Sequence, residues 1–304
     1  MSSVVIEHIT KTYPKATAPA VQDISLSVSP GELFGLIGPD GAGKTTLFRI
    51  LTTLLLPDQG KATVDGFDII RDYRQIRNTI GYMPGRFSLY QDLSVEENLS
   101  FFATIFNTTI ADNYHLIRDI YVQIEPFKHR KAGKLSGGMK QKLALCCALI
   151  HQPTVLFLDE PTTGVDPVSR KEFWDMLGQL KAKGITILVS TPYMDEATRC
   201  DRIALIQQGK IMSVDTPSAI IQAFPQKIHG VKATNMSALL KALASAPVVK
   251  TSYAFGEYAH VLLHREEADE KALTTYLQER GLAEIEVRSA AVTIEDCFIQ
   301  LLSH

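Results

Sequence analysis

The sequence predicts an α/β fold with a parallel, helix-covered sheet, followed by a smaller α+β domain. Three observations lead to this expectation. Short apolar runs alternate with helical stretches up to about residue 223. A glycine-rich turn separates one of these apolar runs from the helix that follows it. Beyond residue 223 the order of elements becomes strand, helix, strand, strand, helix, strand. The length of 304 residues accommodates one large and one small domain, and 45% of the residues are apolar and available for their cores.

The first domain, residues 1–223, is expected to contain buried strands separated by helices. The predicted strands span residues 4–9, 24–28, 33–37, 154–158, 185–189 and 203–206. The predicted helices span residues 43–54, 136–150, 168–181 and 194–199. Strands that alternate with helices form a parallel sheet with both faces covered. Residues 87–134 contain no strong strand candidate, and we predict an α-helical insert there.

The second domain, residues 224–304, has the element order of a ferredoxin-like, split βαβ arrangement. We expect strands at residues 227–233, 248–253, 259–264 and 284–289, and helices at 236–244 and 267–280. A final amphipathic helix spans residues 294–302. Its apolar residues recur at helical spacing and are expected to pack on one face: Ile294, Cys297, Phe298, Leu301 and Leu302.

The composition argues against a nucleic-acid binder and against a chain that crosses a membrane itself. The net charge is −2, and Lys and Arg are spread along the chain rather than gathered in a basic patch. No apolar stretch approaches the roughly 18–20 residues of a membrane helix. Residues 1–10 lack the pattern of a signal peptide. The four cysteines form no C-x-x-C pair, so we expect them to be buried in a protein of the reducing cytosol.

The strongest chemical signal is a G-x-x-x-x-G-K-[ST] pattern between the strand 33–37 and the next helix. This is a P-loop in its expected strand–turn–helix context. Its glycines let several backbone N–H groups converge on phosphate oxygens, and the helix N-terminus adds positive potential. We expect Lys44 to contact the β- and γ-phosphates and Thr45 to place its hydroxyl on Mg²⁺. The predicted nucleotide-binding residues here are Gly38, Pro39, Asp40, Gly41, Ala42, Gly43, Lys44, Thr45 and Thr46.

A second signal is the apolar run 155–158, which ends in Asp159 and Glu160. The carboxyl end of a parallel strand lies at the same sheet edge as the P-loop. We expect Asp159 to hold Mg²⁺ through water and Glu160 to act as the catalytic residue that polarises the attacking water. Together the two motifs predict a P-loop NTPase with a RecA-like core and a Mg²⁺ ion, and the third motif narrows the family to one that uses ATP.

A third motif lies between the first two and is the run Leu135-Ser136-Gly137-Gly138-Met139-Lys140-Gln141. With it, residues 4–220 resemble the ATP-binding cassette (ABC) family, whose signature is LSGGQ; Met139 departs from that pattern. The resemblance implies that Ser136, Gly137 and Gly138 open a helix whose N-terminus grips the γ-phosphate of ATP bound to an opposing cassette. It therefore implies a head-to-tail dimer, homomeric or with a second ABC cassette.

Further segments extend the resemblance. The run 161–167 resembles the D-loop, which would place Asp166 toward the partner cassette, and Tyr13 matches the aromatic residue that stacks on adenine. An ordinary half-buried strand aromatic is the other interpretation of Tyr13. The extension after residue 223 resembles those of ABC-2 type exporters, mainly through residues 293–298.

Two residues expected from the family are absent. Gly85 stands where the family usually has the Q-loop glutamine, and Pro192 stands where it has the switch histidine. Gln91 lies six residues beyond position 85 and is not assumed to substitute. Losing one preorganised donor to transition-state charge costs about 10²–10³ in rate. We therefore expect this chain's own site to bind ATP well and hydrolyse it slowly, while its signature serves a complete partner cassette. The other interpretation is that Glu160 alone suffices.

The leading interpretation is the ATP-hydrolysing motor subunit of an ABC membrane transporter, an exporter on the evidence of the extension. It would act through a separate transmembrane permease subunit and meet the membrane only through that partner. We place it in the cytoplasm, peripheral on the inner face of the cell membrane, with part of the helical insert near Tyr90, Leu93 and Phe101 as the docking surface; plain core residues are the other interpretation of these three. Two alternatives stay open: a non-hydrolysing regulatory ABC subunit, and a soluble ABC ATPase without a role in transport.

Overall fold

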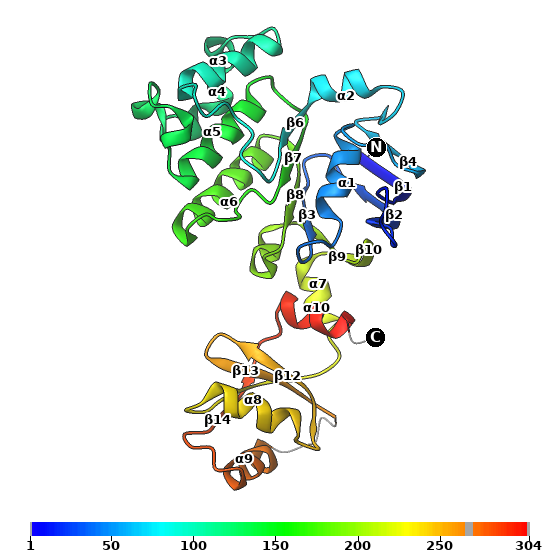
Figure 1. The fold of residues 1–304 in the computed structure, drawn as a ribbon, viewed down its shortest axis with the longest axis vertical. Coiled ribbons are helices and arrows are strands. Elements are labelled where there is room, and N and C mark those ends of the chain that lie inside the picture. Colours follow the sequence, from blue (N-terminus) through cyan, green and yellow to red (C-terminus); the bar gives the residue numbers. More distant parts are fainter. Residues whose placement is uncertain (1, 265–269, 303–304) are drawn as a thin grey trace. The chain divides into compact units, whose positions relative to one another are not determined.

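The computed structural model describes residues 2–264 and 270–302. The chain forms two compact units, Met1–Pro217 and Ser218–His304 (Figure 1). The boundary between the units lies after Pro217, six residues before the boundary that we expected at residue 223. Helix α7 (Pro217–Gln222) therefore falls almost entirely in the second unit. Its association with that unit includes a contact from the Cys297 thiol to the carbonyl of Ile220, with 3.6 Å between sulfur and oxygen.

The first unit is built around a six-stranded sheet with the strand order β10-β9-β3-β8-β7-β6. All neighbours from β9 to β6 are parallel, and only β10 is antiparallel. The central strands are buried along their whole length, as expected for apolar strands covered on both faces. The strands are β3 (Leu33–Ile37), β6 (Ile80–Met83), β7 (Val155–Asp159), β8 (Thr186–Thr191), β9 (Arg202–Gln207) and β10 (Lys210–Asp215).

An antiparallel sheet with the order β2-β1-β4-β5 completes the strands of the first unit. It contains β1 (Val4–Lys11), β2 (Val21–Val28), β4 (Gln59–Val64) and β5 (Phe67–Asp68). The apolar patterns predicted β1 and the second half of β2 but not β4, β5, β6 and β10. These four strands are short or only partly buried, so they lack the continuous apolar run that marks a buried strand.

Helices cover the central sheet and form the insert. They are α1 (Lys44–Leu51), α2 (Tyr73–Thr79), α3 (Val95–Ile105), α4 (Ile110–Tyr121), α5 (Gly137–Leu149) and α6 (Pro167–Ala182). The 3₁₀ helices η1 (Glu125–Phe127) and η2 (Ala132–Lys134) lie between α4 and α5, and the 3₁₀ helix η3 (Met194–Arg199) lies between β8 and β9. Helices α3 and α4 form the insert beside α5 (Figure 1). The predicted helix 43–54 was too long, because α1 ends at Leu51 and Leu54 is exposed. The predicted α-helix 194–199 is the 3₁₀ helix η3.

The second unit has the predicted ferredoxin-like topology. Its sheet is antiparallel throughout, with the order β12-β13-β11-β14. The elements are β11 (Ile228–Lys232), α8 (Met236–Ala244), β12 (Val249–Phe255), β13 (Tyr258–Leu263), α9 (Glu270–Glu279), β14 (Glu286–Ala290) and α10 (Ile294–Leu302). Residues 267–269 of the predicted helix 267–280 lie outside the described residues. In α10, Ile294, Cys297 and Phe298 are buried as expected, whereas Leu301 is only half-buried and Leu302 is 48% exposed.

Within the described residues, no helix is both long enough and apolar enough to cross a membrane. All four cysteines are free thiols, and all four are buried, as the sequence analysis expected.

Candidate nucleotide site

The glycine-rich turn between β3 and α1 requires glycine for steric reasons. Gly41 and Gly43 have φ values of +78° and +106°, a region that L side chains rarely adopt. A Cβ on Gly43 would lie 2.3 Å from the carbonyl oxygen of Ala20, and one on Gly38 would lie 2.2 Å from that of Ile206. The turn therefore packs tightly against Ala20 and Ile206. This packing fixes the backbone conformation directly before the N-terminus of α1.

The remaining residues of the turn lie around this tight backbone. The Ala42 amide donates to the Pro39 carbonyl at 3.2 Å, and Ala42 itself is buried. Asp40 is exposed and Thr45 is half-buried, whereas Thr46 is buried in the first turn of α1. Asp40 and Thr45 therefore keep some access to the exterior, as a binding role requires.

Lys44 is held at the centre of the site. The residue is only 3% exposed, and its Nζ donates to the carbonyls of Gly38 and Pro39 at 2.8 and 3.0 Å. The same Nζ lies 3.0 Å from Oε1 of Glu160. A buried ammonium is stable only when it is paired and hydrogen-bonded, and these three oxygens meet that requirement. Lys44 is thus directed toward the acids at the end of β7.

Asp159 and Glu160 are fixed by Ser190 of the neighbouring strand β8. The Ser190 hydroxyl donates to Oδ1 of buried Asp159 at 2.6 Å. The Glu160 amide lies 3.0 Å from both the carbonyl and the hydroxyl oxygens of Ser190. Glu160 has φ +50°, so the chain turns sharply directly after the strand. The pKa of the nearby Tyr82 hydroxyl is raised to about 12, mainly by burial and secondarily by the charge of Asp159.

The donor set fits a magnesium ion that is held mainly by a nucleotide. Among the described residues, no group of three or more His, Cys, Asp and Glu side chains forms a metal cage. Mg²⁺ bound with substrate phosphates needs only one or two carboxylates and retains several waters. One buried carboxylate, Asp159, and one hydroxyl, Thr45, supply oxygen ligands of the kind this ion prefers.

The missing glutamine belongs directly beside these acids. A Cβ placed on Gly85 would lie 3.1 Å from the carbonyl oxygen and 3.8 Å from Oδ2 of Asp159. A longer side chain at this position would therefore start beside Asp159, and glycine supplies none. Gln91 lies elsewhere, since its carbonyl accepts from the Gly133 amide at 2.9 Å, in η2 ahead of the signature run.

A buried network that the sequence analysis missed surrounds the position of the missing histidine. Glu196, in η3, accepts hydrogen bonds from the hydroxyls of Thr191 at 2.5 Å and Thr162 at 2.8 Å. Arg170 of α6 donates to the same carboxylate at 3.1 Å and stacks 4.1 Å over the ring of Tyr193. The network ties the end of β8, the segment after Glu160 and α6 together. In the sequence, only the acidic pair 195–196 indicates such a network, and the sequence does not reveal which of the two residues is buried.

Tyr13 lies beside the start of α1. Its hydroxyl oxygen is 3.3 Å from Oγ1 of Thr46, and the ring is half-buried. Tyr13 lies two residues beyond the end of β1 (Val4–Lys11), so it is half-buried but is not a strand residue, and the strand interpretation is wrong in that respect.

The signature run and Asp166 form a second, exposed edge. The Ser136 hydroxyl caps α5 by accepting from the Met139 amide at 3.3 Å. A Cβ on Gly138 would lie 2.7 Å from Oγ of Ser169, and one on Gly137 would lie 3.6 Å from the Gly164 carbonyl oxygen. Small residues therefore let the start of α5 approach the start of α6.

Asp166 is the N-cap of α6. Its carboxylate accepts from the amides of Val168 and Ser169 at 3.1 and 3.0 Å. These hydrogen bonds, led by the one from Ser169, lower the pKa of Asp166. Among the described residues, no hydrogen bond or ion pair joins this signature edge to Lys44, Asp159 or Glu160. The structure thus brings the P-loop and the two acids together, while the signature stands apart.

Comparisons with known proteins agree on one family. The model of the family described as "ABC transporter" matches residues 21–163. The chain is 37% identical over 303 residues to the "Probable multidrug ABC transporter ATP-binding protein YbhF" of Escherichia coli, covering 98% of this chain and 52% of that protein. This chain thus spans about half the length of that relative.

Two further comparisons cover most of the matched protein. The chain is 38% identical over 223 residues to "Nod factor export ATP-binding protein I" of Paraburkholderia xenovorans, covering 72% of this chain and 73% of that protein. The solved structure of cbiO1 from Clostridium perfringens, described as part of the ABC transporter complex cbiONQ, matches with a TM-score of 0.65 and 26% identity. That match covers 73% of this chain and 91% of the other.

Proposed function

The chain belongs to the ABC transporter family, and from that premise we propose that it is the ATP-driven motor subunit of an exporter. The observation that carries the proposal is the buried cation Lys44, whose Nζ lies 3.0 Å from Oε1 of Glu160, the residue that follows the buried carboxylate of Asp159 at the end of β7. The relative named as a Nod factor export protein supports outward transport. The substrate would be chosen by the membrane subunit.

In the proposed reaction, the triphosphate of ATP lies along the P-loop at the N-terminus of α1. Lys44 exchanges its contacts with the loop carbonyls and Glu160 for phosphate oxygens, which frees the Glu160 carboxylate. Glu160 then polarises the water that attacks the γ-phosphate. Mg²⁺, when bound at Asp159 and Thr45, would supply charge neutralisation on the phosphates. Tyr13 would lie against the adenine.

We propose that this site turns over slowly. Gly85 has no side chain beside Asp159, and Pro192 has neither a side-chain donor nor a backbone N–H. Each missing donor removes about 10²–10³ in rate, although effects within one site do not simply add. Binding is less affected, because the loop and Lys44 are complete.

The exposed signature edge supports a partner cassette. Ser136 and Gly137 lie at the open N-terminus of α5, where backbone amides favour an anion. Since no contact links this edge to the chain's own acids, we propose that it reaches the γ-phosphate held by a second cassette. Asp166, exposed beside it, would lie at the same interface.

The insert supplies an exposed apolar surface for a membrane partner. Tyr90 and Phe101 are 51% and 37% exposed, and their ring centroids lie 4.8 Å apart in an edge-to-face arrangement. Leu93 is half-buried. These exposures favour a docking role over plain core for the two aromatic residues.

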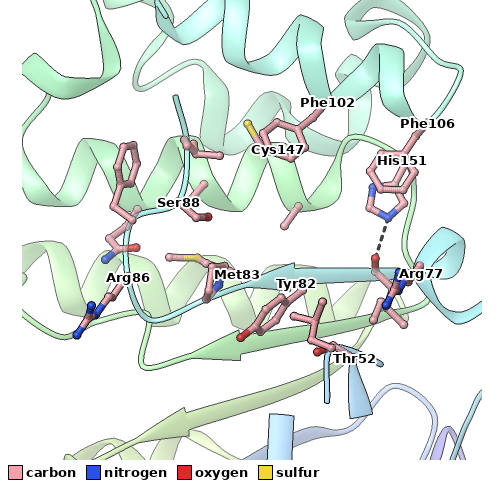
Figure 2. Close-up of a pocket in the computed structure, with 18 residues that line it drawn as sticks. Thr52, Arg77, Tyr82, Met83, Arg86, Ser88, Phe102, Phe106, Cys147 and His151 are labelled. Atoms are coloured by element: carbon pink, nitrogen blue, oxygen red, sulfur yellow. Dashed lines mark hydrogen bonds between the residues drawn. The ribbon is translucent and has the colours of Figure 1, made fainter. Parts of the chain in front are cut away.

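A separate cavity of about 290 Å³ lies between β6, α3 and α5. Figure 2 shows Phe102 and Phe106 on one side and Tyr82 and Met83 on the other, with Arg77 and Arg86 at opposite ends. We propose that a cytoplasmic helix of the permease occupies this groove, with its apolar face inward and acidic residues near the two arginines. The protein would thereby lie at the inner face of the membrane.

A non-hydrolysing regulatory subunit is the second candidate function. The specific observation in its favour is the joint presence of Gly85 and Pro192 at the site.

Steady-state ATP hydrolysis by the purified chain with Mg²⁺, beside Lys44→Ala, tests the proposal. ATP affinity is measured in parallel by titration calorimetry. We expect ATP binding that Lys44→Ala abolishes, with slow turnover that is lost in the same variant. Turnover at an ordinary transporter-like rate would overturn the slow-site proposal. Binding without any turnover, in the presence or absence of a partner cassette, would favour the regulatory function.

A further inference from the structure

The second unit has a hollow on the face of its sheet that α8 and α9 leave open. Val231 and Val261 pack with both helices in the hydrophobic core of this unit. Because successive side chains point to opposite faces of a strand, Gly230, His260 and Arg288 face the other side. A cavity of about 610 Å³ lies there. That volume is within the range of small-molecule sites.

Gly230 forms the floor of this hollow. It pairs with His260 of β13 on one side and with Arg288 of β14 on the other. The two side chains therefore flank a position that has none. A Cβ on Gly230 would meet Ala290, Tyr258 and Arg288 at 3.6 to 3.7 Å, which is ordinary contact. Packing of the chain thus does not require glycine at this position, whereas a ligand lying on the strand would.

His260 lines the hollow and is held there through one ring nitrogen, while its other ring nitrogen has no hydrogen-bond partner among the described residues. The residue is 5% exposed, its Nδ1 lies 2.7 Å from Oδ1 of Asp296, and its ring stacks on Phe255 at 4.1 Å. Since a carboxylate only accepts hydrogen bonds, Nδ1 carries the proton in this pair. Within the part of the chain that the structure describes, Nε2 has no hydrogen-bond partner. It is left to accept a hydrogen bond at the cavity, which His260 lines.

Asp296 holds the His260 ring in this position. It is 1% exposed and accepts hydrogen bonds from the Tyr253 hydroxyl and from the amide and hydroxyl of Thr293. Burial opposes the charge, but the hydrogen bonds from His260, Tyr253 and Thr293 hold the pKa of Asp296 below its usual range. The carboxylate therefore fixes the imidazole ring from behind.

Arg288 supplies a cation that no carboxylate of the described residues pairs with. Its guanidinium lies 3.9 Å over the ring of Tyr258. The nearby acids have other partners, since Glu257 pairs with Lys232 at 2.7 Å and Glu286 accepts from the Tyr258 hydroxyl at 3.1 Å. Arg288 takes part in no ion pair among the described residues. A planar guanidinium with free donors matches a phosphate oxygen pair.

We propose that this hollow is a binding site for a small phosphate monoester that carries a flat aromatic group. The phosphate lies over Gly230, where its oxygens accept from Arg288. A phosphate monoester retains an O–H in part near neutral pH, because its second pKa is about 6, and this group donates to Nε2 of His260. The flat group lies against Phe255 and Tyr258, whose rings line the cavity.

Titration calorimetry of phenyl phosphate into the full chain tests the site, with amide chemical shifts of ¹⁵N-labelled protein to locate it. We expect saturable binding with shifts around Gly230 and Arg288. Arg288→Gln should weaken binding at least tenfold, and Gly230→Val should abolish it by filling the floor. Arg280→Gln is the matched control, because Arg280 also lies over a tyrosine, Tyr276, at 4.9 Å, and it should change affinity less than twofold.

Two further comparisons test whether the binding occurs in this hollow. Lys44→Ala should leave the binding of phenyl phosphate unchanged, which separates this site from the nucleotide site of the first unit. If Gly230→Val does not fold, Gly230→Ala and Arg288→Gln still give the answer. The proposal is overturned if Arg288→Gln binds within twofold of the unaltered chain, or if the shifts lie away from Gly230. Equal affinity for inorganic phosphate would overturn the role of the aromatic group.

Discussion

Neighbouring strands of the central sheet differ sharply at the edge where the nucleotide site lies. After β3 the P-loop is complete, and β7 ends in two carboxylates, one of them 3.0 Å from Lys44. The strands on either side of β7 are β6 and β8. The segments after them carry Gly85 and Pro192, where polar side chains are usual in the family. The residues that we propose to hold phosphate are thus present, while two side chains expected from the family, next to the reacting water and γ-phosphate, are absent. We therefore propose that binding and turnover can be separated at this edge, and variants test each.

The end of β8, where the expected histidine is absent, nevertheless contains a buried polar network. Glu196 is 4% exposed and takes hydrogen bonds from Thr191, Thr162 and Arg170 directly next to Pro192. A buried carboxylate without such partners would be strongly unfavourable. Its place between β8 and α6 indicates that the shape of the strand end still matters even though the histidine is absent.

The largest effect is expected from Glu160→Gln. Removing a general base lowers a rate by about 10²–10⁴, and the amide cannot polarise water as the carboxylate does. Single-turnover hydrolysis of radiolabelled ATP measures the slow step directly, and calorimetry should show that ATP still binds. Glu172→Gln is the control, because Glu172 pairs with Lys142 on the surface. An unchanged rate in Glu160→Gln would mean that another group activates the water.

The next largest effect is expected on stability, from Glu196→Gln. The substitution leaves Arg170 facing a neutral amide in a buried network, which typically destabilises by about 2–4 kcal/mol. Urea denaturation measures the free energy of unfolding. Asp195→Asn is a matched control, since Asp195 also pairs with Arg170 but its side chain is 76% exposed, and exposed pairs contribute little. Equal losses in the two variants would show that burial of Glu196 is not what matters.

A smaller gain is expected from restoring the lost histidine. Pro192→His places a donor directly after β8, where one such group is worth about 10²–10³ in rate. The single-turnover rate should rise by at least tenfold with ATP affinity unchanged. Gly85→Gln should give less, because its Cβ would lie 3.1 Å from the Asp159 carbonyl oxygen and that strand end must first shift. A rate that stays flat in Pro192→His would show that the missing histidine is not what limits turnover.

Much of this edge was predictable because its chemistry depends on residue order along the chain. The P-loop, Asp159 and Glu160 follow apolar runs that are visible in the sequence, and the structure brings Lys44 and Glu160 together as predicted. The ferredoxin-like unit followed in the same way from the order of its elements.

Other features depend on contacts between segments far apart, which no local pattern encodes. The Glu196 network joins residues from three segments, and the Gly230 hollow arises only when β13 and β14 flank β11. Strands β4 and β10 were missed because their exposed faces dilute the apolar signal. Asp166 was expected at a partner interface, yet its visible contacts are those of an N-cap, a local role that the sequence also permits.

The smallest effect separates these two roles of Asp166. Asp166→Ala removes the hydrogen bonds to the Val168 and Ser169 amides, and loss of an N-cap in a domain of this size should lower the Tm by about 2–4 °C. Asp166→Asn should restore most of the Tm, because asparagine caps helices well. Since the folded pKa of Asp166 is depressed, its contribution to stability is present above the usual carboxyl pKa and is lost as the pH falls through the lower, folded pKa. The Tm difference between the unaltered chain and Asp166→Ala should therefore shrink in acid. If Asp166→Asn keeps the Tm but loses ATP-dependent dimerisation in light scattering, the carboxylate serves the partner cassette as well as the helix; if it keeps both, Asp166 is a cap alone.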